Sequence, residues 1–284
     1  MRVIEDPAEF QSACRRHLGG LGLVPTMGAL HEGHLSLVRA SRARDAATAA
    51  SIFVNPLQFG PQEDFARYPR TFDRDLALLE REGATLVFAP RVEAMYEPGF
   101  ATAVEVAGLS ERLCGASRPG HFRGVATVVL KLLHLAGPAR AYFGQKDAAQ
   151  AALIRRMVRD LAVPVEIVTM PIVREPDGLA LSSRNAYLDT VARQRAALLY
   201  RALDAVRRRY ESGERDASRL VAAGRAVLEA ETAIRLDYFA AVDAESLLPV
   251  ASAGPGTLFA VAAFLGGTRL IDNLVITADG TAQL

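Results

Sequence analysis

The stretch that decides the fold is residues 21–34, which read LGLVPTMGALHEGH. Its first four residues form an apolar run typical of a buried strand, and apolar residues recur at helical spacing after the last histidine. The turn between them carries His31 and His34, with Gly28 and Gly33 close by. A strand-turn-helix junction leaves backbone N–H groups unpaired at the helix N-terminus, where the helix dipole adds partial positive charge. The stretch therefore predicts an anion site, above all a phosphate site.

His31 and His34 form a His-x-Gly-His pattern, which differs from a Walker loop and from the Gly-x-Gly-x-x-Gly fingerprint. The pattern resembles the signature of the nucleotidyltransferase superfamily, whose members bind ATP and attack its α-phosphate. Two histidines of this kind can equally cap a turn, since histidine is often a satisfied structural side chain. The motif alone leaves both interpretations open.

The composition is that of a compact globular chain rather than a disordered one. Half of the 284 residues are hydrophobic, 23% are charged and the formal net charge is +1, so we expect neither a nucleic-acid nor a membrane partner. Cys14 and Cys114 lie far apart and outside any metal-ligand spacing. The sequence has no signal-peptide pattern and no apolar run of membrane-spanning length. We therefore expect a cytoplasmic protein with one large or two modest domains.

Up to residue 175, short apolar segments alternate with amphipathic ones. The expected strands are Leu21–Val24, Ala49–Val54, Thr85–Ala89, Ala141–Phe143 and Val165–Thr169, and the expected helices are Leu35–Arg44, Asp73–Arg81, Val125–Leu135 and Ala148–Leu161. This alternation predicts a parallel sheet with helices on both faces, and hence a Rossmann-like nucleotide-binding domain over residues 1–175. Ligands of such sheets bind beyond the carboxyl ends of the strands.

After residue 175 the pattern changes. Two helical stretches, Thr190–Glu211 and Ala217–Glu231, precede three strand-like segments that are separated by Gly- and Pro-containing turns. The strand-like segments are Leu236–Val242, Thr257–Phe264 and Arg269–Ile276. We expect residues 176–284 to form a smaller C-terminal α+β domain with an antiparallel sheet.

Two polar segments of the first domain are suited to a small polar substrate or an anion. Asn55 and Gln58 follow a strand and offer neutral donors and acceptors, although a plain Asn-Pro turn with Gln58 in solvent is the more ordinary interpretation. Arg118–Gly124 places two arginines and a histidine at the entrance of an apolar helix. That arrangement indicates either an anion site or a surface loop cap.

Two further segments are suited to phosphate. Gly144 opens a turn after a strand, Lys146 supplies a mobile positive charge, and Asp147 can either cap the next helix or hold a ribose hydroxyl. Residues 181–185 read LSSRN, in which two serines can donate to phosphate and Arg184 offers a fork for pyrophosphate, with a plain N-capping box as the alternative. Because this stretch lies at the domain junction, we expect a phosphate clamp on a C-terminal domain that acts as a lid.

Taken together, the motifs resemble the pantoate–β-alanine ligase (pantothenate synthetase) family along nearly the whole chain. The shared motifs, in the family's order, are Pro-Thr-Met-Gly-x-Leu-His-x-Gly-His, Phe-Val-Asn-Pro-x-Gln-Phe, Arg-Pro-x-His-Phe-x-Gly-Val, Phe-Gly-x-Lys-Asp and Ser-Ser-Arg-Asn. The resemblance implies an ATP-dependent ligase in which pantoate attacks the α-phosphate of ATP and β-alanine then displaces AMP from pantoyl adenylate. It also implies a homodimer and Mg²⁺ that is bound mainly through phosphate oxygens, with no protein ligand named.

The resemblance also implies roles for individual residues. The implied ATP-binding residues are Met27, Gly28, Ala29, Leu30, His31, Glu32, Gly33, His34, Gly144, Gln145, Lys146, Asp147, Val173, Leu181, Ser182, Ser183 and Arg184. Among these, the implied catalytic residues are His34 (the proton donor), His31, Lys146 and Arg184, and Val173 is implied to contact the adenine. Gln58 and Gln150 are implied to hold pantoate, with Gln58 also near β-alanine.

Three positions depart from the family's usual pattern: Gln145 stands where Glu is common, Leu181 where Met is usual and Ala149 where Gln is frequent. We expect the first two changes to be tolerated, because backbone groups make those contacts. Ala149 matters only if Gln150 does not hold pantoate.

Two rival functions are weighed against the ligase. The first is a cytidylyltransferase-like enzyme that keeps the nucleotide on its product. Gln58, Gln150 and the Arg118–Gly124 run favour the ligase over it. The second is a non-catalytic nucleotide-binding module. The full set of phosphate-binding side chains argues against that second function, because a sensor has little need of them.

Overall fold

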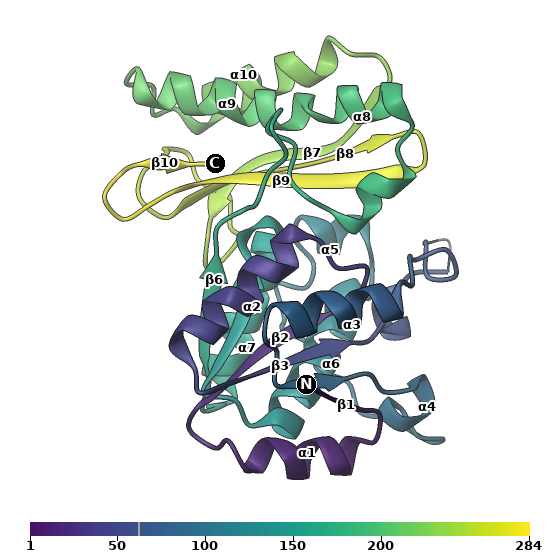
Figure 1. Ribbon diagram of the computed structural model, residues 1–284. Coiled ribbons are helices and arrows are strands. Elements are labelled where there is room, and N and C mark those ends of the chain that lie inside the picture. The colour runs from purple at the N-terminus through teal and green to yellow at the C-terminus, as the bar shows by residue number, and fades with distance from the viewer. Residues whose placement is uncertain (62) are drawn as a thin grey trace. The chain divides into compact units, whose positions relative to one another are not determined.

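The computed structural model describes residues 1–61 and 63–284 and divides into two compact units (Figure 1). The first unit comprises Met1–Glu111, Arg118–Gly144 and Leu153–Met170. The second comprises Arg112–Ser117, Gln145–Ala152 and Pro171–Leu284. Within the described residues, no helix combines the length and apolar character needed to cross a bilayer.

The first unit is built on a six-stranded sheet in which every neighbouring pair of strands is parallel. Its strands are β1 (Arg2–Ile4), β2 (Leu21–Thr26), β3 (Ala47–Ile52), β4 (Leu86–Phe88), β5 (Arg140–Gly144) and β6 (Glu166–Met170), in the order β1-β4-β3-β2-β5-β6. The interior strands are almost continuously buried, as expected for a sheet covered on both faces. This sheet confirms the predicted Rossmann-like α/β fold.

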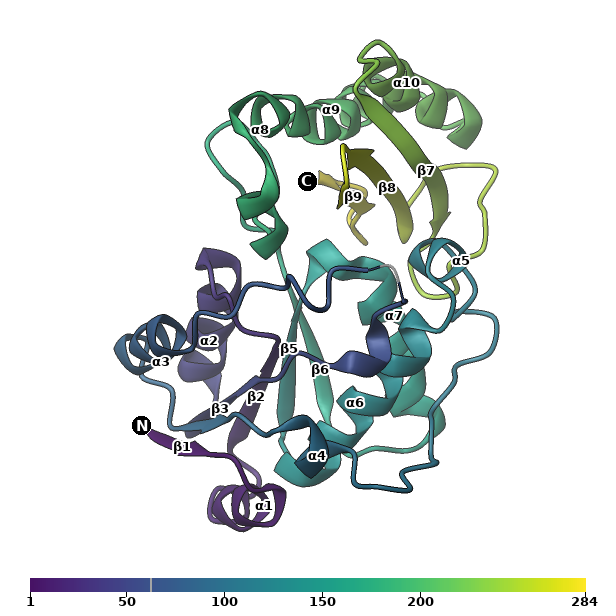
Figure 2. The same ribbon diagram turned by 90° about the vertical axis from the view of Figure 1, so that its right-hand side faces the viewer.

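Helices cover both faces of this sheet (Figure 2). Helices α2 (Glu32–Arg44) and α3 (Phe72–Arg81) lie on one face, and α6 (His121–Ala136) lies on the other and packs against α1 (Pro7–Arg15). The core under α2 and α3 consists of Val24, Leu30, Leu37, Val38, Ala50, Leu79, Ala84, Val87 and Tyr142. This core fixes the ends of α2 and α3 relative to the strand that carries the histidine motif.

The strand order reverses between β2 and β5. On one side of β2 lie β3, β4 and β1, and on the other side lie β5 and β6. Because Leu23 pairs with Ala141 in parallel register, β2 and β5 end side by side at Thr26 and Gly144. The histidine motif follows Thr26, and the turn with Lys146 follows Gly144. Ligands of open α/β sheets bind at such a reversal of strand order.

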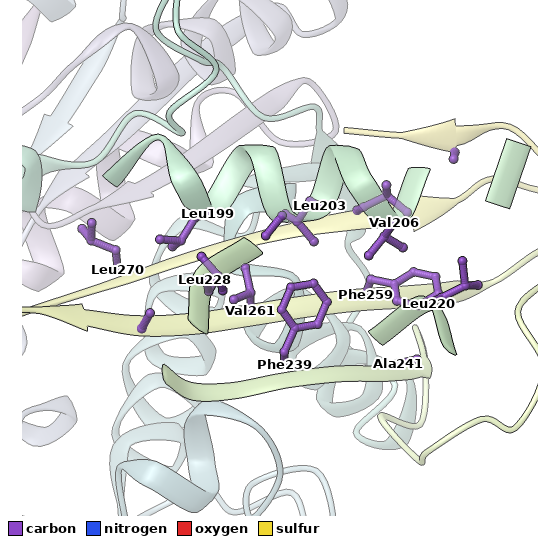
Figure 3. Close-up of a cluster of buried hydrophobic side chains, with 14 of the residues drawn as sticks. Leu199, Leu203, Val206, Leu220, Leu228, Phe239, Ala241, Phe259, Val261 and Leu270 are labelled. Atoms are coloured by element: carbon purple, nitrogen blue, oxygen red, sulfur yellow. The ribbon is translucent and has the colours of Figure 1, made fainter. Parts of the chain in front are cut away.

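The second unit contains a four-stranded antiparallel sheet in the order β10-β9-β8-β7. Its strands are β7 (Ile234–Asp243), β8 (Thr257–Leu265), β9 (Thr268–Ile276) and β10 (Ala282–Gln283). Helices α9 (Leu198–Glu211) and α10 (Ala217–Glu229) pack on each other and on this sheet. Figure 3 shows the core between them, formed by Leu199, Leu203, Val206, Leu220, Leu228, Phe239, Phe259, Val261 and Leu270. The arrangement confirms the predicted C-terminal α+β domain.

Several elements differ from the sequence-based expectation. The structure adds β1, α1, β10 and the short helices α4 (Val92–Met95) and α5 (Cys114–Ser117), which are not among the elements expected from the sequence. The helix expected over Thr190–Glu211 is two helices, α8 (Thr190–Ala196) and α9. At Ala197, between them, ψ is −14° and the N–H bonds the carbonyl of Arg195, which tightens the chain beyond α-helical geometry.

Candidate active site

Backbone N–H groups of the loop after β2 already have hydrogen-bond partners within the protein. The sequence pattern predicts unpaired N–H groups at this junction. The N–H of Gly28 bonds Thr26 Oγ1 at 3.2 Å. The N–H groups of Ala29 and Leu30 each bond a carboxylate oxygen of Asp75 at 2.8 Å. The N–H groups of these three loop residues are therefore not open to an anion, because a threonine hydroxyl and a carboxylate from α3 already accept from them.

The rings of His31 and His34 cap the N-terminus of α2 through their Nδ1 atoms. Nδ1 of His31 accepts from the N–H of Gly33 at 3.2 Å, and Nδ1 of His34 accepts from the N–H of His31 at 3.3 Å. A nitrogen that accepts carries no proton, so each neutral ring has its proton on Nε2. The ring centroids lie 4.1 Å apart. The two histidines therefore cap the helix, as the capping interpretation predicts. In this arrangement each neutral ring carries its N–H donor at Nε2.

Gln58 is buried, being only 9% exposed, and does not lie in solvent. It ends the 3₁₀ turn η1 (Pro56–Gln58), and its Nε2 donates to Met27 Sδ at 3.1 Å. Its Oε1 accepts from Asn55, which is 1% exposed and also accepts from the hydroxyl of Tyr96. The structure therefore places the amide of Gln58 beside the loop predicted to bind ATP.

The backbone of α6 approaches this turn closely at Gly124. A Cβ on Gly124 would lie 2.2 Å from the carbonyl oxygen of Leu57, and Asn55 Nδ2 donates to the Gly124 carbonyl at 3.1 Å. Real Cβ atoms do not come that close to a backbone oxygen, so only glycine permits this packing. The helix therefore sets the position of the turn that carries Gln58.

Arg118 bonds the same turn, because its Nη2 donates to the carbonyl oxygen of Gln58 at 3.3 Å. Its guanidinium group is paired with a carboxylate rather than open to an anion. Its Nε and Nη2 donate to the two carboxylate oxygens of Glu63 at 2.7 and 2.6 Å, and its side chain is 14% exposed. His121 Nδ1 lies 2.9 Å from the carbonyl oxygen of Gln58. The anion hypothesis for Arg118–Gly124 is wrong for Arg118, because a carboxylate already compensates its charge.

The Glu63–Arg118 pair leads to a pH dependence of stability. Burial alone would raise the pKa of Glu63, but the hydrogen bonds and the positive charge of Arg118 outweigh it and hold that pKa below its ordinary value. A depressed carboxyl pKa stabilises the fold above the unfolded-state pKa, and this contribution is lost as pH falls through the folded-state pKa. Glu63→Gln is therefore expected to melt at a lower temperature than the wild type near pH 7, with a gap that closes below about pH 4. Thermal melts across this range check the prediction, and a gap of constant size would contradict it.

The Lys146 turn, η2 (Gln145–Asp147), is attached to β9. Asn273 Nδ2 donates to the carbonyl oxygens of Gln145 and Lys146 at 2.9 and 3.0 Å. Gln145 Nε2 donates back to Asn273 Oδ1 at 3.2 Å. Lys146 Nζ lies 3.9 Å from Asp147 Oδ2, which is a loose ion pair. The backbone of the turn is therefore fixed by hydrogen bonds, while the ammonium group is held only weakly by its neighbouring carboxylate.

Val173 and Leu181 are brought together by a short hairpin. The N–H of Leu181 donates to the carbonyl of Val173 at 3.0 Å, next to an antiparallel bridge between Arg174 and Ala180. Immediately afterwards, Ser182 Oγ accepts from the N–H of Arg184 at 3.3 Å and begins the turn η3 (Ser183–Tyr187). The N-capping interpretation of this motif therefore holds for Ser182.

Comparison with known proteins decides the family. The family model described as Pantoate-beta-alanine ligase matches residues 2–275. A pantothenate synthetase of Koribacter versatilis (strain Ellin345) is 56% identical, over 100% of this chain and 98% of its own. The chain belongs to the pantoate–β-alanine ligase family.

Solved structures of such ligases share the fold. The crystal structure of pantothenate synthetase from Thermus thermophilus has a TM-score of 0.93 and 51% identity, covering 98% of this chain and 100% of its own. The pantoate-β-alanine ligase of Francisella tularensis, complexed with beta-gamma ATP and β-alanine, has a TM-score of 0.79 and 31% identity, covering 97% of each chain. This chain is thus a pantoate–β-alanine ligase, and the cytidylyltransferase-like and non-catalytic alternatives are set aside.

The predicted site residues of this ligase fall into two groups. The first unit holds Met27–His34, Gln58 and Gly144, and the second holds Gln145, Lys146, Asp147, Gln150, Val173 and residues 181–184. Within these groups, direct contacts join Gln58 to Met27 and Val173 to Leu181. The roles of these residues stay predictions.

Two residues outside the motifs of the sequence, Asp75 and Asn273, hold the predicted loops. Asp75 is 1% exposed and lies four residues before the buried Leu79, on the inner face of α3. Asn273 is 2% exposed and lies within the largely buried strand β9, next to Leu274. In both cases the available signal was a polar residue at a position where the pattern requires an apolar one, since buried polar groups need specific partners.

Proposed function

We propose that the chain makes pantothenate in two steps, which the residues named above carry out. A carboxylate oxygen of pantoate attacks the α-phosphorus of ATP, and the bond from that phosphorus to pyrophosphate breaks. The amine of β-alanine then attacks the acyl carbon, the amide bond forms with loss of a proton, and AMP leaves with the bonding electron pair. No side chain acts as the nucleophile, because the substrate carboxylate has that role.

The observation that carries the proposal is the pair of Nδ1 acceptors on His31 and His34. Both Nδ1 atoms accept from backbone N–H groups at the helix N-terminus, which supports Nε2–H as the donor of each neutral ring. We propose that these Nε2–H groups donate to phosphate oxygens. In the first step negative charge builds on the α-phosphate and on the departing pyrophosphate, and preorganised donors stabilise that charge. We assign His34 as the proton donor and His31 as the second phosphate contact. The other loop residues from Met27 to Gly33 contact ATP.

Lys146 and Arg184 supply the positive charges in this proposal. The strand ends at Thr26 and Gly144 belong to neighbouring parallel strands, which run about 4.8 Å apart. Lys146 is two residues past Gly144, so its Cα lies within about 7 Å of the Cα of Gly144. We propose that the ammonium group and the histidine pair bind the phosphates of the same ATP. Gly144, Gln145 and Asp147 bind the nucleotide, Val173 contacts the adenine, and Leu181, Ser182 and Ser183 close on the phosphates with Arg184.

Gln58 and Gln150 hold pantoate in this proposal. Gln58 lies on a fixed turn and carries a neutral amide. The NH₂ group of such an amide can donate to a carboxylate, and its oxygen can accept from a hydroxyl, as a small polar acid requires. The position of Gln58 beside Met27 supports binding of pantoate next to ATP, and we also place β-alanine near this residue.

We further propose that Mg²⁺ accompanies ATP and is held mainly by its phosphate oxygens. Within residues 1–61 and 63–284, no group of three or more His, Cys, Asp or Glu side chains is arranged to hold a metal ion. The described residues therefore fit no dedicated cation cage, and we derive no step through the metal. A homodimer, a cytoplasmic location and a division into a substrate-binding domain over 1–175 and a lid over 176–284 complete the proposal.

ATP–pyrophosphate exchange tests the proposed function. Labelled pyrophosphate is expected to enter ATP only when pantoate is present, because the adenylate forms before β-alanine is needed. Exchange that proceeds without pantoate, or equally well with unrelated carboxylic acids, would overturn the first step. Pantothenate formation without any pantoate-dependent exchange would overturn the adenylate intermediate.

A further inference from the structure

Asp75 is a buried carboxylate outside the set of residues assigned to substrates. It lies in the first turn of α3 and is 1% exposed. Its Oδ2 accepts from the N–H of Ala29 at 2.8 Å, and its Oδ1 accepts from the N–H of Leu30 at 2.8 Å and from Thr71 Oγ1 at 3.1 Å. The α3 N-terminus also favours a negative charge at this place. The carboxylate is therefore bound to the loop by charge-assisted hydrogen bonds, which are stronger than neutral ones.

The loop needs such a partner because its backbone is unusual. Gly28 and Ala29 have left-handed backbones, with φ of +82° and +49°, and a residue with a side chain adopts that conformation only at a cost. Asp75 binds the N–H groups of Ala29 and of the residue after it, which fixes the turn at the point of strain. A Cβ on Gly28 would lie 3.1 Å from Asp75 Oδ2, so the carboxylate also packs tightly against the turn.

The turn determines where the histidine pair lies. Leu30 directly precedes His31, which is the N-cap of α2, and the ring of His34 bonds the His31 backbone. A backbone change at Ala29 would therefore move the first turn of α2 and both rings with it. The N–H groups of Ala29 and Leu30 donate to the Asp75 carboxylate, so they do not donate to a phosphate. In the proposed function the Nε2–H groups of the two histidines donate to the phosphate instead.

We propose that Asp75 is a positioning residue for ATP, which it places by fixing the Gly28–Leu30 turn and thereby the Nε2 donors of His31 and His34. This inference rests on the proposed assignment of Met27–His34 to ATP. Asp75 touches neither substrate nor reacting atoms in this proposal, and it acts through the loop.

The test compares Asp75→Asn with Asp73→Asn. Both changes remove one carboxylate from the first turn of α3, but Asp73 is exposed and serves as the matched control. In Asp75→Asn, an amide NH₂ faces one of the two N–H donors, so that hydrogen bond is lost. The KM for ATP in pantoate-dependent exchange is expected to rise about tenfold, with the KM for pantoate unchanged, while Asp73→Asn stays at the wild-type values. Asp75→Glu is expected to recover part of the ATP affinity, because the negative charge is retained.

Two outcomes would overturn the proposal. The first is an ATP KM for Asp75→Asn equal to that of Asp73→Asn. The second is a loss of maximal rate alone that follows the fraction of unfolded protein, with both KM values unchanged, which would make Asp75 merely structural. If Asp75→Asn does not fold, Thr71→Val replaces it: this change removes the hydroxyl that donates to Oδ1 and is expected to raise only the ATP KM, by a smaller factor. An unchanged ATP KM in the folded Thr71→Val protein would also contradict the proposal.

His34→Asn in the same assay separates this inference from the proposed function. If His34→Asn keeps full exchange, the assignment of the loop to ATP fails, whatever Asp75 does. If His34→Asn loses exchange and Asp75→Asn has the same ATP KM as Asp73→Asn, the assignment of the loop to ATP stands. In that case only the inference about Asp75 fails.

Discussion

Replacing His34 with Asn is expected to lower the maximal rate of pantoate-dependent ATP–pyrophosphate exchange by about 100-fold to 1,000-fold. An Asn side chain can place an acceptor near the position of Nδ1, so the cap on the N–H of His31 is preserved. It has no donor at the position of Nε2, where the proposal places the phosphate contact and the proton donor. Initial rates at saturating ATP and pantoate measure the effect.

His134→Asn is the matched control for this prediction. His134 is exposed in the last turn of α6, and its replacement is expected to leave the exchange rate unchanged. His34→Gln, which can bring an amide donor near the Nε2 position, is expected to recover part of the rate. Full activity in His34→Asn with an unchanged melting temperature would remove His34 from the phosphate site.

Gly124→Ala is expected to lower the stability of the enzyme and its affinity for pantoate together. The added Cβ would lie 2.2 Å from the Leu57 carbonyl oxygen, so either α6 or the turn that carries Gln58 must move. Overpacking of this kind costs roughly 1–3 kcal/mol of folding free energy. If Gln58 loses its hydrogen bond to pantoate, the KM for pantoate rises by about tenfold to a hundredfold. Denaturant unfolding and steady-state kinetics measure the two effects.

Gly267→Ala serves as the comparison for Gly124→Ala. Nothing lies within 4 Å of a Cβ built on Gly267, and its φ is not in the left-handed region, so stability and kinetics are expected to stay near those of the wild type. A rise in the ATP KM of Gly124→Ala with no change for pantoate would contradict the assignment of Gln58. A Gly124→Ala protein as stable as the wild type would contradict the close packing itself.

The parallel sheet could be predicted because its evidence is local. Each interior strand is a short apolar run, and the helices between strands show apolar residues at helical spacing. Helix α1 was also open to prediction, since Asp6 caps it, Pro7 follows, and Phe10, Ala13 and Cys14 form its buried face. Strand β1, by contrast, has three residues and only one of them is buried, so it carries too little pattern to be recognised.

The partners of the site loops could not be predicted, because they come from distant parts of the chain. Asp75 bonds a residue 46 positions before it, and Asn273 bonds Lys146 from 127 positions away. The sequence also could not show that Asp75 accepts from the amides of Ala29 and Leu30. Local rules identify which N–H groups a helix start leaves unpaired, but they do not say whether a ligand or another side chain accepts from them.

The attachment of the Lys146 turn to β9 limits how this enzyme can be divided. Two of the three hydrogen bonds between Asn273 and the turn go to backbone carbonyls, so they would be lost in any fragment that ends before β9. A fragment that stops near residue 175 would carry the lysine but not the strand that fixes its backbone. Hybrid enzymes built from two relatives must therefore take residues 145–152 from the same parent as the C-terminal sheet, although these residues follow directly on a strand of the other unit.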